Sequence, residues 1–164
     1  MEHQNTNMLG ALEEECEQVE TQLMVLEDKG RWTKIMATVD SGAAEHVMPI
    51  GMLPRVTAVK SENPKKYVTA DGGRLQDGGS KKVQFTTQRG AQRIITFRAI
   101  GVMKPLVSTC KLVKTGHRVV MEGDSPRIEC PNGDVIPIKE MNGVYTLEMW
   151  IDTAIYGPVF SRPV

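Results

Sequence analysis

The sequence predicts a mainly β domain that contains one short helix and follows an N-terminal amphipathic helix. Short apolar runs rich in Val, Ile and Thr recur from residue 31 onward, separated by turn-forming Gly, Pro and Asn residues. In residues 106–116 and in the first thirty residues, the apolar positions instead have the spacing of a helix. With 40% hydrophobic residues in 164, the chain can bury one core of moderate size.

Residues 7–29 are expected to form the amphipathic helix, within an acidic segment or linker that spans residues 1–30. Asn7 can cap its start and Gly30 can end it. Its apolar positions follow each other in steps of three and four, as in a coiled-coil seam; they are Leu9, Leu12, Cys16, Val19, Leu23 and Leu26. A seam this short is marginal alone, so two interpretations stay open: the helix pairs between two chains, or it packs on its own domain as a linker remnant.

Residues 32–39 are expected to form a strand that ends at the turn Asp40-Ser41-Gly42. Burying a lone carboxylate at the end of an apolar strand is unfavourable unless the group is paired or hydrogen-bonded. Gly42 allows a sharp turn, and the small Ala43 and Ala44 leave space for a close approach. Asp, Ser and Gly are also ordinary turn residues, so the alternative is a strand-terminating turn in which Asp40 caps its own backbone.

The rest of the chain is expected to be rich in β-structure. Strands are predicted over 47–59 in short pieces, 67–73, 82–87, 93–100, 117–121, 127–130, 135–138 and 144–151. The segments 82–87 and 93–100 pair as a hairpin, and Asn132-Gly133-Asp134 forms a second hairpin turn. Residues 106–116 form the short helix, and residues 153–164 form an extended tail.

The segment centred on Asp40-Ser41-Gly42-Ala43 resembles the active-site loop of retropepsin-type aspartic proteases. Later segments follow the order of that family: residues 69–73 lie where its flap begins, and Leu106-Val107-Ser108 with the helix after it resembles its strand-to-helix passage. Ser108 stands where the family favours Gly. Together with the phrase at residues 142–147, these segments are similar to the protease region of copia-type retrotransposon polyproteins.

The resemblance implies a retropepsin-like closed β-barrel (acid protease fold) over residues 31–152, and an aspartic endopeptidase that processes a retrotransposon polyprotein. Two aspartates share one proton in such a site, because two like charges at close range cannot both ionise easily. The chain has one such motif, since Pro126 after Asp124-Ser125 removes the backbone donor that a glycine would supply. The second aspartate must then come from a second copy, so a homodimer is expected.

The resemblance gives the catalytic role to Asp40, with Ser41 bonding across the dimer interface and Gly42 holding the carboxylates through its N–H group. It places four flap residues and one loop residue against the polypeptide substrate: Ala43, Ala70, Asp71, Gly72 and Gly73. Neither a cofactor nor a metal is expected, because the three cysteines and three histidines are scattered without ligand spacing.

Composition also bears on partners and location. There is neither an apolar run long enough to cross a bilayer nor a signal-peptide pattern, so a cytoplasmic, reducing setting without a membrane partner is expected. The net charge of zero is the sum of an acidic segment over the first thirty residues and a remainder with a net charge of +7. The basic residues of this remainder are scattered, so they only weakly suggest that the protein binds nucleic acid. Two other functions stay open: a catalytically inactive peptide-binding or dimerisation module, and a nucleic-acid-associated segment of a polyprotein.

Overall fold

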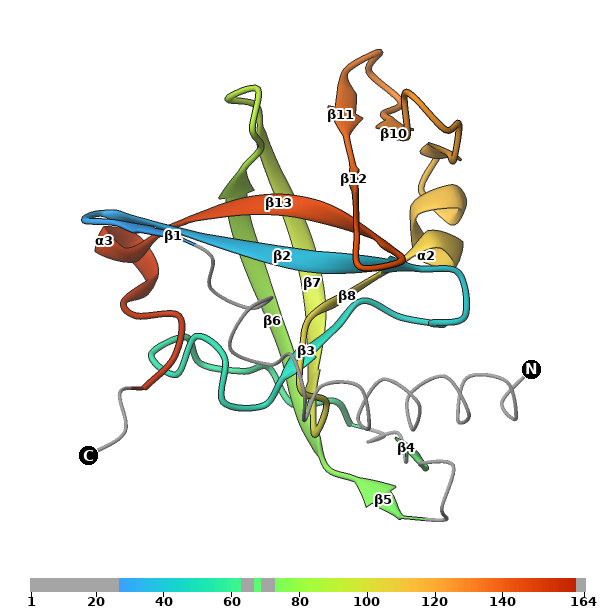
Figure 1. Cartoon of the computed structure of the whole chain (residues 1–164). Helices are drawn as coiled ribbons and strands as arrows, with labels where there is room; N and C mark the ends of the chain where they lie inside the picture. The colour runs from blue at the N-terminus through green and yellow to red at the C-terminus, as the bar shows by residue number, and fades with distance from the viewer. Residues whose placement is uncertain (1–26, 63–66, 69–72, 162–164) are drawn as a thin grey trace.

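The computed structural model of the chain describes residues 27–62, 67–68 and 73–161, and it is mainly β, as predicted (Figure 1). The strands of its main sheet are β1 (Glu27–Lys29), β2 (Trp32–Asp40), β3 (Val47–Pro49), β6 (Asp77–Thr86), β7 (Gln92–Ile100), β8 (Leu106–Ser108), β12 (Lys139–Met141) and β13 (Val144–Asp152). They lie in the spatial order β1-β2-β8-β3-β7-β6-β13-β12.

Strand β2 is the centre of this sheet. It pairs in parallel with β8 and antiparallel with β13, from Trp32 opposite Asp152 to Thr38 opposite Thr146. β13 also pairs with β6, so it lies between β2 on one side and the β6–β7 hairpin on the other. In Figure 1, β2 and β13 run side by side while β6 and β7 cross them. β2 is buried without interruption from Ile35 to Asp40, so successive side chains on both of its faces are covered, which accounts for the mostly apolar sequence there.

The predicted hairpin over 82–100 is confirmed as β6 and β7, and β6 begins earlier than expected. Its first residues contain a register shift between Asp77 and Ser80, where Gly79 has a φ of 89°. The Asp77 carboxylate accepts a hydrogen bond from the Gly79 N–H at 2.9 Å, which stabilises this bulge. Further along β6, buried Lys81 alternates with exposed Lys82, as expected for a strand with one face on the core.

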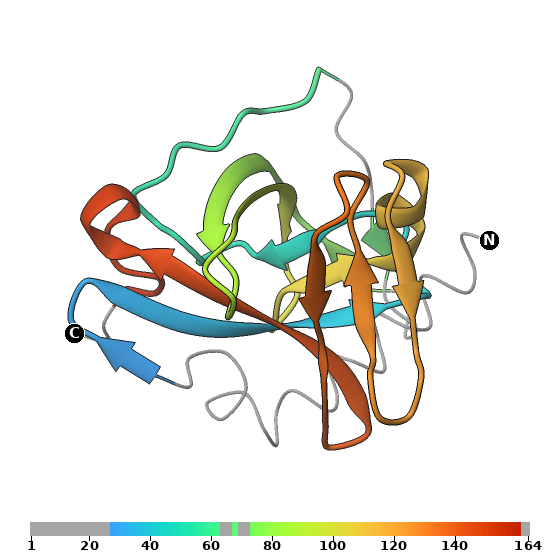
Figure 2. The same cartoon turned by 90° about the horizontal axis from the view of Figure 1, so that it is seen from above.

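A second, three-stranded sheet follows the helix α2 (Thr109–Lys114) and consists of β9 (Arg118–Val120), β10 (Arg127–Glu129) and β11 (Val135–Pro137). All three strands and the turn at Asn132-Gly133-Asp134 were predicted. Figure 2 shows them side by side next to α2. A two-stranded sheet pairs β4 (Tyr67–Val68) with β5 (Arg74–Leu75).

The main core lies between the β6–β7 hairpin, β2, β13 and the three-stranded sheet. Its fully buried side chains include Ile35, Met48, Met52, Leu53, Val83, Phe97, Ile128, Leu147, Met149 and Ile151. Among the described residues, four buried methionines (Met36 is the fourth) supply packing that the few aromatic residues do not. Among the described residues, no helix has the length and apolar character needed to cross a membrane.

The N-terminal boundary was predicted incorrectly. Residues 27–29 form β1 rather than the end of a helix, because they pair with the edge of β2. Gly30, with a φ of 63°, and Arg31 make the two-residue turn that joins these strands. The helix expected over residues 7–26 lies outside the described residues.

Two further local predictions were wrong. Residues 106–108 form β8 instead of the first turn of the short helix that their spacing predicted, because parallel pairing with β2 decides their conformation. The order of a strand followed by a helix is the one that the resemblance implied for this segment. Residues 153–156 form α3 (Thr153–Tyr156) instead of the start of an extended tail. The Asp152 carboxylate accepts the Ala154 N–H at 3.0 Å, which caps this short helix.

Candidate functional site

Asp40 is the last residue of β2, and its side chain is buried, with 6% of its surface exposed. Its position in the parallel pairing lies opposite Ser108, the last residue of β8. The chain turns directly after Asp40, and the Gly42 N–H donates a hydrogen bond of 2.8 Å to Asp40 Oδ1. Asp40 Oδ2 is buried and has no hydrogen-bond partner among the described residues.

Burial raises the pKa of the Asp40 carboxyl above its ordinary value, because an ionised group loses hydration in the protein interior. Three weaker influences oppose this rise and favour the charged form: the backbone N–H of Gly42, the positive charge of Lys104 and the backbone N–H of Ala43. Lys104 lies in the connection before β8 and is itself buried, with 5% of its surface exposed. Burial outweighs these three influences, so the neutral form of the Asp40 carboxyl is favoured more than it is in a solvent-exposed aspartate.

Ser108 holds the turn after Asp40 from the opposite strand. Its hydroxyl donates to the Ala43 carbonyl at 2.6 Å and accepts the Lys111 N–H at 3.1 Å, so one fully buried side chain bonds the turn and caps α2. The sequence left open how closely a serine would let the strand approach the turn. β8 and β2 pair directly, and the Ser108 hydroxyl reaches from the end of β8 to the Ala43 carbonyl in the turn after β2.

His46 makes a second connection between the two segments. Its Nδ1 atom accepts the Ser108 N–H at 2.9 Å, and the ring packs edge-on against Phe97. Burial, with smaller contributions from the positive charges of Lys111 and His117, lowers the pKa of His46 to about 4. A neutral imidazole at ordinary pH is what this hydrogen bond requires, because a protonated Nδ1 cannot accept it.

The predicted site residues are only partly brought together. Asp40, Gly42 and Ala43 lie in one turn, with Ala43 buried and Gly42 half-buried, whereas Ser41 points to the surface. Gly73 is exposed just before β5. The other predicted flap residues, Ala70, Asp71 and Gly72, lie outside the described residues.

Three residues near Asp40 were not assigned a role from the sequence: Ser108, His46 and Lys104. Ser108 was noted only as a departure from the resembled family. Lys104 carries a usable signal, since it is the one charged residue in the otherwise uncharged stretch Ile100 to Val107. A long-range bond such as Ser108 to Ala43 has no signature in the sequence, because 65 positions separate the two residues.

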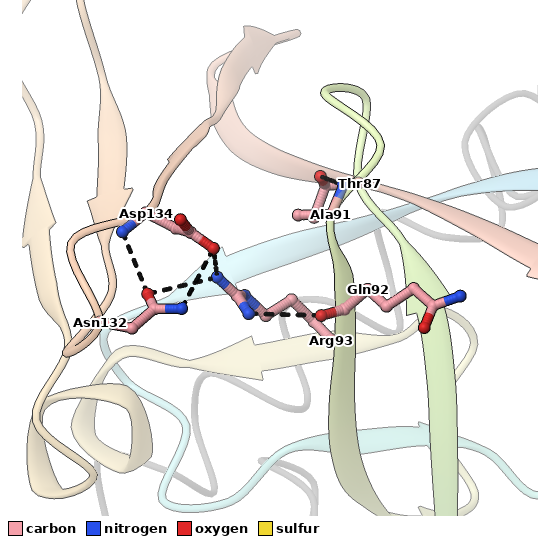
Figure 3. A network of polar contacts seen from close by, with 6 residues as sticks. All are labelled: Thr87, Ala91, Gln92, Arg93, Asn132 and Asp134. Atoms are coloured by element: carbon pink, nitrogen blue, oxygen red, sulfur yellow. Dashed lines mark hydrogen bonds and ion pairs between the residues drawn. The ribbon is translucent and has the colours of Figure 1, made fainter.

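A cavity of about 460 Å³ lies beside this site, between the β6–β7 hairpin, α2 and the three-stranded sheet. His46 and Leu112 line it from the site's side, but Asp40, Ser41 and Gly42 do not. Across it, Arg93 of β7 forms an ion pair with Asp134 and contacts Asn132 in the turn between β10 and β11 (Figure 3). The cavity therefore belongs to the junction between the two sheets and not to the carboxylate.

A scan against models of known protein families found no match to this sequence, and a search of curated proteins found no relative. The interpretation of the site therefore depends on its own residues. Within the described parts of the chain, no group of three or more His, Cys, Asp and Glu side chains is arranged to hold a metal ion.

Proposed function

We propose that the protein is an aspartic endopeptidase of the retropepsin type, active as a homodimer in which two Asp40 carboxyls share the catalytic proton. One observation carries this proposal: a carboxylate at a strand end is buried, has a raised pKa, and keeps one oxygen without a partner among the described residues. A carboxylate that only capped its own turn would gain nothing from burial, since the Gly42 hydrogen bond can form equally well at the surface.

The strand arrangement is consistent with the fold that the proposal requires. β13 pairs with both β2 and β6, which links the two parts of the strand order and supports a closed β-barrel. Ser41 is exposed beside buried Asp40, so its hydroxyl is available to a second copy of the turn. In a symmetric dimer the two Asp40 residues would then lie near the twofold axis.

In the proposed mechanism, one Asp40 carboxylate accepts a proton from the attacking water while the other, protonated, donates to the scissile carbonyl oxygen. The carboxyls titrate as a pair, so neither pKa belongs to one subunit alone. Retrotransposon polyprotein processing is the proposed biological role, on the basis of the sequence resemblance.

The test is hydrolysis of denatured proteins at mildly acidic pH by wild type, Asp40→Asn and Asp124→Asn. Asp124 is a matched control, because it is an exposed acid that is also followed by serine. We expect Asp40→Asn to lose more than the ~10²–10⁴-fold in rate that one acid–base group contributes, and Asp124→Asn to keep full activity. An aspartic-protease transition-state analogue is expected to inhibit the wild type.

Wild-type rates in Asp40→Asn would eliminate Asp40 as the catalytic acid. Specific peptide binding by wild type without any cleavage would favour an inactive peptide-binding module instead.

A further inference from the structure

From the contacts around Ala43, we infer that Ser108 is a positioning residue for the Asp40 carboxylate, acting through the Ala43 peptide groups. This inference rests on the proposed function. Ser108 stands at the position where the resembled family favours glycine. The inference therefore gives a role to a side chain that the family pattern lacks.

The contacts hold Ala43 from two sides. Its N–H group faces Asp40 and favours the charged carboxylate, while its carbonyl accepts the Ser108 hydroxyl at 2.6 Å. Ser108 is completely buried, so water cannot replace this donor if the hydroxyl is removed. Without this bond the buried Ala43 carbonyl loses its donor, and we expect the turn that carries the Gly42 and Ala43 N–H groups to be held less rigidly against Asp40.

Ser108 is itself fixed by two further bonds. Its N–H donates to His46 Nδ1 at 2.9 Å, and its hydroxyl accepts the Lys111 N–H at 3.1 Å. Pairing with Asp40 across β2 and β8 sets its backbone. The hydroxyl is therefore directed from three sides toward one carbonyl, which is the arrangement expected of a group that supports a catalytic side chain.

Ser108→Gly is the most informative variant, because it installs the residue that the family favours and deletes only the hydroxymethyl group. If the family's requirement is merely close approach of two backbones, this variant keeps full activity. If the hydroxyl positions Asp40, we expect kcat to fall about 10–100-fold with KM nearly unchanged, since small displacements of a catalytic group have effects of this size.

The second readout is the titration of the Asp40 carboxyl, followed by its ¹³C chemical shift in the full chain, with Asp40→Asn used to assign the signal. Loss of fixed N–H groups removes stabilisation of the anion, so the apparent pKa of Asp40 is expected to rise in Ser108→Gly and in Ser108→Ala. Ser108→Ala retains the β-carbon and serves for the same comparison if the glycine variant does not fold. The acidic limb of the kcat profile is expected to move upward with it.

Asp152→Ala is the matched control. It also removes the cap of a short helix, α3, together with the ion pair to Arg31, and it lies opposite Trp32 at the far end of β2 from Asp40. The inference is supported if the Ser108 variants shift the Asp40 titration and Asp152→Ala does not. It is overturned if Ser108→Gly titrates like wild type, or if any loss of kcat occurs without a shift in the titration. The titration also separates the two proposals: a wild type that cleaves no peptide contradicts the protease function, while the shift still tests Ser108.

Discussion

At the scale of single residues, Asp40 is controlled by opposing interactions that come from three separate segments. Burial at the end of β2 favours its neutral form, while the turn after it and Lys104 before β8 favour the charged form. The turn after Asp40 could be predicted from the sequence, because an acid followed by Ser-Gly-Ala after an apolar strand is a local pattern. The sequence could not identify Ser108, His46 or Lys104 as neighbours, because the pairing of β2 with β8 brings them there.

Replacing Asp40 by Asn is expected to stabilise the folded protein, most strongly at neutral pH. The folded-state pKa is raised, so the folded chain holds the proton more tightly than the unfolded chain, and wild-type stability falls as pH rises through this range. Asn does not ionise and escapes this loss. Urea unfolding of both proteins at pH 4 and pH 7 checks the prediction; a variant less stable than wild type at pH 7 would favour the structural turn-cap interpretation.

His46 is expected to give the opposite pH dependence. Its pKa is lowered to about 4 in the folded protein, whereas an unfolded histidine titrates near ~6.5. Unfolding between these pH values therefore takes up about one proton, and this contribution to stability is lost as pH falls from the unfolded toward the folded value. Comparing the pH dependence of unfolding in wild type and His46→Gln measures it. Identical slopes in the two proteins between pH 4 and 6.5 would contradict a buried neutral imidazole.

At the scale of elements, patterns with a strong local signal were predicted and short paired segments were not. The β6–β7 hairpin, the three strands after α2 and the turn at Asn132-Gly133-Asp134 were all predicted from alternation and turn chemistry. β1, β5 and β12 are two or three residues long and mostly polar, so only their partners define them as strands. The spacing of residues 106–108 is helical, and the segment is a strand because it pairs with β2; the resemblance, unlike the spacing, implied a strand there.

Lys81 of β6 illustrates an element-level contact that sequence patterns do not reveal. Its buried ammonium donates to the carbonyls of Met52 and Leu53, at 3.0 and 2.9 Å, and so fastens the loop after β3. Lys81→Met is expected to lower stability by about 1–3 kcal/mol, because it leaves a buried carbonyl unsatisfied. Lys82→Met, the exposed neighbour on the same strand, is expected to change it by less than ~0.5 kcal/mol. Equal effects in thermal or urea unfolding would contradict this contact.

At the scale of the whole molecule, the proposed chemistry requires more than one chain. The described residues supply one motif of the Asp-Ser-Gly type, with its carboxylate buried and its serine exposed beside it. The cavity next to the site does not include Asp40, so it does not offer a single-chain alternative for the reaction. The resemblance predicts a site that a second copy completes, and this remains a prediction.

The most direct test of a shared site is to mix subunits. A fixed amount of wild-type protein is incubated with increasing Asp40→Asn protein, under conditions in which dimers exchange, and peptide hydrolysis is measured. If each active site needs Asp40 from both subunits, mixed dimers are inactive, and an equal amount of the variant is expected to reduce activity to about half, with larger amounts reducing it toward zero. Asp124→Asn added in the same way is expected not to reduce it. Activity that stays constant as Asp40→Asn is added would contradict a catalytic site shared between two copies of this chain.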